Sequence, residues 1–205
     1  MNNDPRDNAL QAATPTVMVP RFGTFEPLTE PGHRFLATAD GLWLELKRAW
    51  LYLCMPLACQ YLVAMPYGRV EESIDLIFGS VPSALMEEFC GQAKDRLPNE
   101  HAAWITWNEV TGHIRLRALG EISAAPGHIH FNRPVLAEGE HLVLDVHSHG
   151  TLPAFFSATD NRDDGEVKIA GVIGNLDTPH PTAEFRLCAL GVFLPMPGTA
   201  KGKES

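Results

Sequence analysis

The sequence predicts an α+β fold, with a mixed β-sheet flanked by helices and a β-rich N-terminal region before it. Three observations lead to this class. Short segments of alternating or continuous apolar residues recur along the chain and are typical of strands. Helical signals are fewer and begin near Ser83 and Ser157. These signals lie among the strands and not in a block of their own, which favours helices packed on a mixed sheet.

The N-terminal part of the chain carries no motif. Residues 1–13 are polar and lack periodicity, so we expect a disordered tail. Residues 14–78 form the expected β-rich region, and its expected strands are 16–19, 35–39, 42–53 and 60–65. Asp40 and Gly41 give a strong hairpin-turn signal between the second and third of these strands.

Residues 79–195 form the expected second domain, and residues 196–205 an expected disordered tail. A helix is predicted over 83–96, with apolar residues at helical spacing. It ends there because Leu97 precedes Pro98 and is therefore disfavoured in a helix. The expected strands are 101–107, 113–119, 129–132, 141–149, 167–175 and 184–194, and a second short helix starts at Ser157.

Composition excludes several classes of partner and location. The formal net charge of -9 argues against a non-specific grip on nucleic acid. Apolar runs are too short to span a membrane, and the N-terminus lacks the basic and apolar regions of a signal peptide. The 4 cysteines form no Cys-x-x-Cys pair, so we expect reduced thiols and, by default, a cytoplasmic protein.

A candidate metal site lies at the end of the expected strand 141–149. His147 and His149 are two residues apart, so their side chains share one face of the strand. At roughly 6.5–7 Å between their Cα atoms, two imidazoles can converge on one metal ion. Asp160 follows eleven residues later and can add a carboxylate. Three nitrogen and oxygen ligands leave a fourth position for water, which is typical of a catalytic Zn²⁺ site.

Ser157 precedes Asp160 by three residues, and two roles are open for it. Ser-x-x-Asp is a helix-capping pattern, and a hydroxyl at this place can also donate a hydrogen bond to an oxyanion. A His-x-His pair alone is weak evidence, since His128 and His130 form another, for which surface or packing roles are favoured. The complete His-x-His-x7-Ser-x2-Asp string arises by chance in on the order of one in a thousand such sequences.

This string resembles the signature of the JAMM metalloproteases, also called the JAB or MPN-plus family. Over nearly its full length the chain also resembles the PRTRC genetic system protein A group, in segments such as DGLWLELKRAW, LPNEHAAWITW and GEVKIAGVIGNLD. The resemblance implies an α/β sandwich of the JAB/MPN type, with cytidine-deaminase-like topology. It also implies a zinc ion bound by His147, His149 and Asp160.

The same resemblance implies an upstream glutamate that acts as general base on the zinc-activated water. Glu100 matches by position, because it follows the expected helix, precedes a strand and stands 47 residues before His147. Without the motif, Glu100 would be interpreted as a surface carboxylate at a helix end. Glu109 and Glu121 are poorer candidates for the base, since they lie in a turn or at a strand end.

Two positions depart from the family pattern without removing a ligand. Gly150 stands where the family usually has proline, and Phe156 stands where proline usually precedes the serine. The loop 150–156 is apolar enough either to plug the core or to contact a peptide. Asp145 shares a face with His147 and can either orient its imidazole or join a network between strands.

The predicted function is therefore a zinc metallopeptidase or isopeptidase. By resemblance, its substrate is a peptide or isopeptide bond at the tail of a ubiquitin-like protein. Two alternatives stay open: a scaffold or binding module with this fold but no turnover, and a zinc hydrolase that acts on a small amide. The sequence predicts neither the oligomeric state nor the identity of the scissile bond.

Overall fold

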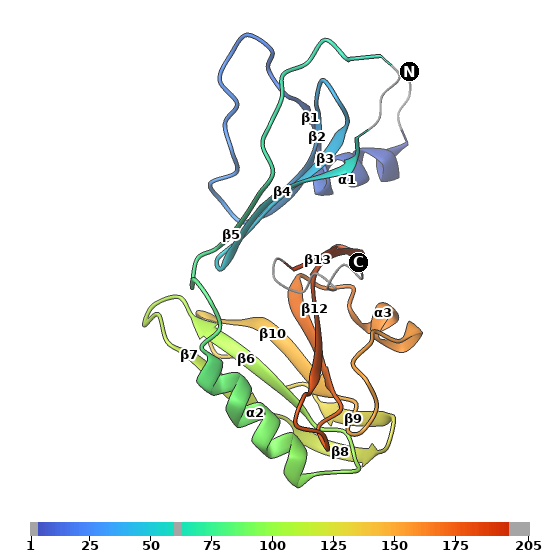
Figure 1. Cartoon of the computed structure of the whole chain (residues 1–205). Coiled ribbons are helices and arrows are strands. Elements are labelled where there is room, and N and C mark those ends of the chain that lie inside the picture. Colours follow the sequence, from blue (N-terminus) through green and yellow to red (C-terminus); the bar gives the residue numbers. More distant parts are fainter. Residues whose placement is uncertain (1–3, 60–62, 197–205) are drawn as a thin grey trace. The chain divides into compact units, whose positions relative to one another are not determined.

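The computed structural model describes residues 4–59 and 63–196. The chain divides into two compact units, Met1–Ser80 and Val81–Ser205, and each has its own main β-sheet (Figure 1). The predicted α+β class with a β-rich N-terminal region is confirmed, because strands predominate and helices are few. No helix in the described part of the chain is long and apolar enough to cross a membrane.

The first unit is built on a five-stranded sheet in the order β1-β2-β3-β4-β5 (Figure 1). Its strands are β1 Thr16–Met18, β2 Gly32–Ala37, β3 Leu42–Arg48, β4 Leu51–Ala58 and β5 Ser73–Leu76. β1 and β2 are parallel, and the other neighbours are antiparallel. The hairpin predicted at Asp40 and Gly41 is confirmed, since Ala37 pairs with Leu42 across it.

Three predictions for the first unit differ from the structure, and one of them lies partly outside the residues that the structure describes. Residues 5–13 are not a disordered tail but a helix, α1 (Pro5–Ala13), which Asp4 caps by accepting from the Arg6 N–H. α1 has no buried residue, so apolar periodicity could not reveal it. The predicted strand 42–53 is two strands joined at Ala49 and Trp50. Of the predicted strand 60–65, residues 60–62 are outside the described part and 63–65 are not a strand.

The second unit contains a six-stranded sheet in the order β13-β12-β11-β10-β6-β7 (Figure 1). Its strands are β6 Ala102–Asn108, β7 Ile114–Ala118, β10 Glu140–Ser148, β11 Lys168–Gly174, β12 Thr182–Ala189 and β13 Val192–Pro195. β10 lies inside the sheet, antiparallel to β6 on one side and parallel to β11 on the other. The connection from β10 to β11 contains the short helix α3 (Ala158–Asp163).

A two-stranded ribbon, β8 (Gly120–Ala125) and β9 (His128–Asn132), completes the strands of this unit. β8 was not predicted from the sequence. The predicted strand 184–194 is in fact β12 and β13, because Leu190 and Gly191 both have positive φ and form a tight turn. Of the predicted tail 196–205, residues 197–205 lie outside the described part of the chain.

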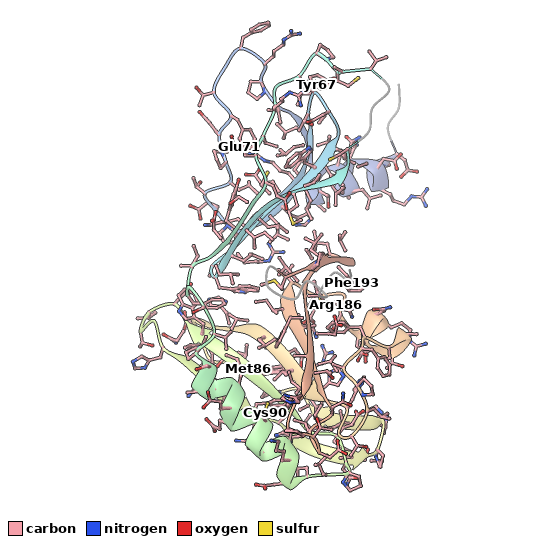
Figure 2. All side chains as sticks on the ribbon, in the orientation of Figure 1. Tyr67, Glu71, Met86, Cys90, Arg186 and Phe193 are labelled. Carbon is pink, nitrogen blue, oxygen red and sulfur yellow. The ribbon has the colours of Figure 1, made fainter. Side chains whose placement is uncertain are left out.

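Helix α2 (Ser83–Asp95) is the helix predicted over 83–96. Phe89 and Ala93 are buried, and Met86 and Cys90 are partly buried (Figure 2). The Phe89 ring stacks on the His101 ring with centroids 5.6 Å apart. This contact fixes the start of β6 and with it the segment that carries Glu100.

The end of β11 leaves no room for a side chain at Gly174. A Cβ atom there would lie 2.2 Å from the Leu152 carbonyl oxygen and 2.4 Å from the Ala154 nitrogen. The loop that follows His149 therefore packs directly against the backbone of β11.

We expect Gly174→Ala to destabilise the protein by about 1–3 kcal/mol, because backbone atoms must move to admit the methyl group. Gly91→Ala is the matched control, since Gly91 is an exposed position of α2 with open space around it. That control should be neutral or more stable by up to about 1 kcal/mol. Chemical denaturation of both variants measures the difference, and equal stabilities would contradict the close packing of this loop.

Candidate metal centre

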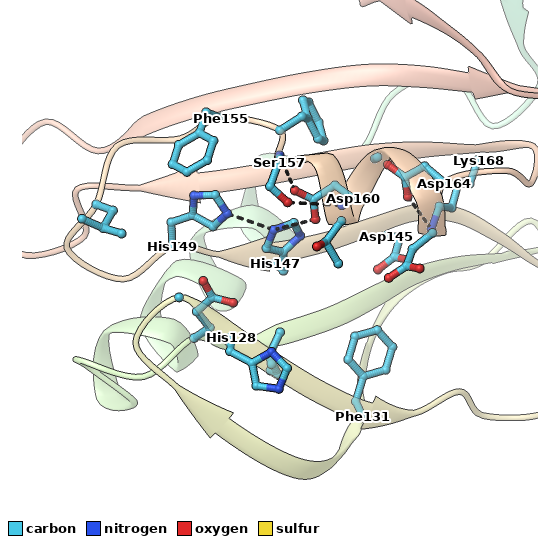
Figure 3. Close-up of a pocket in the computed structure, with 18 of the residues that line it drawn as sticks. His128, Phe131, Asp145, His147, His149, Phe155, Ser157, Asp160, Asp164 and Lys168 are labelled. Carbon is cyan, nitrogen blue, oxygen red and sulfur yellow. Dashed lines mark hydrogen bonds and ion pairs between the residues drawn. The ribbon is translucent and has the colours of Figure 1, made fainter.

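Three side chains converge at the end of β10. The Nε2 atoms of His147 and His149 are 3.2 Å apart, and His147 Nε2 lies 3.5 Å from Asp160 Oδ1. One ligand atom from each of the three residues lies within 4.8 Å of the others. Within the described residues, this is the one cluster of three or more such side chains that could hold a metal ion. Figure 3 shows the two imidazoles and the carboxylate pointing toward one another.

These separations fit a zinc ion. Two nitrogen ligands at 2.0–2.1 Å from one tetrahedral ion are about 3.3 Å apart, close to the separation of the two imidazole nitrogens. The His–His–Asp donor set is also a type that zinc accepts in catalytic sites. The three donor atoms therefore already lie close enough together to face one ion.

α3 places Asp160 by a reciprocal capping box at its first turn. The Asp160 N–H donates to Ser157 Oγ (3.2 Å), and the Ser157 N–H donates to Asp160 Oδ2 (2.6 Å). One carboxylate oxygen is thereby fixed by the backbone, and the other, Oδ1, is directed toward His147. Ser157 is therefore a helix cap, and its own O–H is still a donor that can face the pocket.

His149 is held in the tautomer that metal binding requires. Its Nδ1 lies 3.3 Å from the Pro153 carbonyl oxygen, which can only accept a hydrogen bond. Nδ1 therefore carries the proton and Nε2 presents its lone pair to the cluster. The Phe155 ring packs edge-on against the imidazole, with centroids 4.5 Å apart.

The protonation states of the three residues suit metal binding. Burial lowers the pKa of both His147 and His149, so both imidazoles are neutral at physiological pH. Burial opposes ionisation of Asp160, but hydrogen bonds from Ser157 and the nearby His147 outweigh it and lower the pKa of the carboxyl. The cluster thus offers two neutral nitrogens and one carboxylate.

Glu100 lines the same pocket as these three residues and is only 5% exposed. Burial, and then the negative charge of Asp160, raise its pKa to about 7. The Glu100 N–H donates to the Ala125 carbonyl oxygen, 3.3 Å away at the end of β8. This hydrogen bond joins the segment before β6 to the β8–β9 ribbon. A carboxyl with this pKa can both accept and return a proton near neutral pH.

The pocket has a volume of about 330 Å³ and is bounded by two walls (Figure 3). One wall is the loop 150–157 with α3, where Leu152 and Phe155 are each about half exposed. The other wall is the ribbon strand β9 and its ends, with His128 and Phe131. Exposure of Leu152 and Phe155 favours contact with a ligand over a role as core plug, the two interpretations left open for this loop.

Several lining residues were missed or misjudged from sequence. His128 is exposed, as expected, but no motif around it indicated that it also lines the pocket. Asp145 accepts a hydrogen bond from buried Lys168 Nζ at 2.7 Å and has no described hydrogen bond to His147. Of the two roles left open for Asp145, this favours the network between strands. Glu109, a poorer candidate for the base, instead pairs with His141 at 3.3 Å. Lys168 carried no sequence signal, since its partners lie far along the chain or on another element.

Comparisons with known proteins now add the family. Residues 82–188, just over half of the chain, match the model of the prokaryotic homologs of the JAB domain. The chain belongs to the prokaryotic JAB family. Residues 4–77 of this JAB protein match a domain of unknown function, DUF2016. The predicted family and the JAB/MPN-like domain are thereby confirmed.

Neither curated proteins nor solved structures add a function to this family assignment for the JAB protein. No curated protein matches it. Among solved structures, it is similar to the solution structure of protein DSY2949 from Desulfitobacterium hafniense, with 21% identity and a TM-score of 0.43. The similarity covers 55% of this chain and 86% of that one.

The two departures from the JAB pattern each have a local reason. Gly150 has φ +57, which proline cannot adopt, and a Cβ atom there would lie 2.9 Å from the Pro98 carbonyl oxygen. Glycine thus lets the segment leading to Glu100 approach the end of the ligand strand. The Phe156 ring lies 3.8 Å from the guanidinium of Arg186, a contact that proline could not replace.

We expect the tag-free JAB protein to bind close to one zinc ion per chain, and His147→Ala and Asp160→Ala to lose it, because each variant removes a ligand. Mass spectrometry of the purified proteins measures the metal. His130→Ala is the matched control, since His130 belongs to the other His-x-His pair, is exposed and lies outside this pocket. A folded wild-type protein that takes up no zinc when supplied with it would contradict the metal site.

Proposed function

We propose that this JAB protein is a zinc-dependent peptidase or isopeptidase. The observation that carries the proposal is the convergence of His147, His149 and Asp160 in one pocket that also holds the buried carboxyl of Glu100. A scaffold without turnover needs neither the three donor atoms nor a carboxyl with a pKa of about 7. We further propose the cytoplasm as its location, since all four cysteines are free thiols.

The chemistry divides among the residues as follows. A zinc ion held by the three ligands would polarise a substrate carbonyl and lower the pKa of water. Glu100 accepts the proton of the attacking water and passes it to the leaving amine nitrogen, so that the C–N bond breaks without release of an unstable amide anion. The O–H of Ser157 donates to the carbonyl oxygen as negative charge develops there.

The substrate in this proposal is a peptide or isopeptide bond at the tail of a ubiquitin-like protein. It is supported by the family and by the pocket, whose two walls leave space between loop 150–157 and strand β9 for an extended segment. A small amide would use the same proton transfers, so the choice between the two substrates requires an assay of both.

We expect Glu100→Gln to lower kcat/KM by a factor of about 100 or more while zinc stays bound, because the amide cannot accept the proton. The assay uses a ubiquitin-like protein joined through its tail to a reporter, by a peptide bond and by a lysine isopeptide bond. A short acyl anilide tests the small-amide alternative. Glu109→Gln is the matched control, since Glu109 lies in a different turn and outside this pocket.

The outcomes separate the candidate functions. Hydrolysis of only the anilide would favour the small-amide hydrolase. A zinc-loaded wild type that cleaves none of the substrates would favour the scaffold, and an active Glu100→Gln would remove Glu100 from the proposed role.

The raised pKa of Glu100 predicts that Glu100→Gln stabilises the protein by an amount that depends on pH. The folded-state pKa of Glu100 is raised from 4.5 to about 7, so the folded state binds the proton more tightly than the unfolded state. The stabilising proton is present at low pH and is lost as pH rises through about 7. With a chelator present, Glu100→Gln should therefore gain about 2 kcal/mol more over the wild type at pH 8 than at pH 5.

Urea denaturation of both proteins at the two pH values measures this difference. Glu109→Gln should show no comparable gain, because Glu109 is about half exposed. A Glu100→Gln effect that is the same at pH 5 and pH 8 would show that the carboxyl is not destabilised by burial.

A further inference from the structure

We infer that Arg186 is a positioning residue that sets Asp160 against the two histidines. Arg186 lies on β12, outside the metal-binding string, and its described contacts are with residues other than the three ligands. The inference rests on the proposed function, because it assigns Arg186 a purpose at the proposed zinc site.

α3 cannot be held by apolar packing of its own. It has six residues and none of them is buried. A helix this short is unstable in isolation, so contacts outside the helix must define its position. Asp160 lies in the first turn of α3, so the position of its carboxylate depends on those outside contacts.

Arg186 contacts the chain at both ends of this helix. Its Nη1 donates to Asn161 Oδ1 at 2.6 Å, and its Nη2 donates to Asp164 Oδ2, at the C-terminal cap, at 2.7 Å. Its guanidinium also lies 3.8 Å from the ring of Phe156, the residue that precedes the N-cap Ser157. One side chain thus fixes the entry, the middle and the exit of α3.

Arg186 is itself held rigidly. It is 8% exposed, and the ring of Phe193 on the neighbouring strand β13 lies 4.0 Å from its guanidinium. Figure 2 shows Arg186 and Phe193 side by side on these two strands. Planar donors that are packed on aromatic rings lose little freedom when they bond, which suits a fixed anchor.

The contacts continue to the strand that carries the histidines. Asp164 also accepts from Lys168 Nζ at 2.9 Å, and Lys168 bonds to Asp145 at 2.7 Å. Asp145 precedes His147 by two residues on the same face of β10. Two cations and two carboxylates therefore form a neutral buried chain from β12 through α3 to the ligand strand, which limits the cost of burying them.

The test compares Arg186→Met with Arg117→Met. Both remove an arginine that pairs with a buried carboxylate of this unit, but Arg117 pairs with Glu140 at 3.0 Å and has no contact with α3 among the interactions described. Zinc affinity is measured by competition with a chromophoric chelator. We expect Arg186→Met to bind zinc about 10–100-fold more weakly than the wild type, and Arg117→Met to bind it equally well.

Hydrogen exchange of the α3 amides gives a readout without metal. The N–H groups of Asn161 and Asp164 bond within the helix, to Ser157 and Asp160. With a metal chelator present, these two N–H groups should exchange faster in Arg186→Met than in the wild type or in Arg117→Met. If Arg186→Met does not fold, Asn161→Ala removes one of its contacts and should show the same changes at smaller size.

The outcomes are distinguishable from failure of the proposed function. A wild type without zinc affinity removes the proposed function, while the exchange experiment still decides whether Arg186 positions α3. Unchanged exchange and unchanged zinc affinity in Arg186→Met would overturn the inference. So would an equal loss of zinc affinity in Arg117→Met, because the effect would then reflect general stability.

Discussion

The site depends on the position of β10 inside its sheet. The strand is hydrogen-bonded on both sides, to β6 and to β11, so its backbone is fixed up to the end where His147 and His149 project. Its buried face, with Leu144 and Val146, anchors the strand in the core. Two imidazoles two residues apart on such a strand differ little in position from one molecule to the next. The remaining geometric freedom belongs to Asp160, which comes from another element.

The site brings buried carboxyl groups close together. Their burial lowers the stability of the fold but suits proton transfer. Glu100 is buried near Asp160 without a cation beside it in the described contacts, and this raises its pKa. A paired glutamate such as Glu140, which bonds to Arg115 and Thr106, has a pKa lowered to about 2. Pairing stabilises a carboxylate and makes it a poor proton carrier, whereas burial beside the charge of Asp160 gives Glu100 a pKa that suits proton transfer. The JAB domain contains both a buried glutamate without a described cation partner, Glu100, and a paired one, Glu140, in separate places.

Sequence reasoning succeeded where the signal was local. The helix over α2, the turn at Asp40 and most strands of the second unit follow from periodicity and turn residues. It failed where a long-range contact or a surface cap decides the structure. α1 buries nothing, and β8 is a mostly exposed strand that pairs only with β9 in the described part of the chain. Arg186 lies in a strand that also contains Glu184, and nothing near it in the sequence indicates its partners 22–25 residues away.

The three candidate ligands were predictable because their spacing is short, but the shape of the site around them was not. Gly150 and Phe156, the two departures from the family pattern, both lie in the loop that joins the histidines to α3. Gly150 brings the backbone of Pro98 close, and so helps to place Glu100, while Phe156 packs on Arg186, and so helps to place Asp160. The two residues that stand in place of proline therefore lie next to different carboxyl-bearing segments, those of Glu100 and Asp160. In this family member, the loop between His149 and α3 links the proposed base and the proposed ligand Asp160 to separate contacts in the fold, one at Pro98 and one at Arg186.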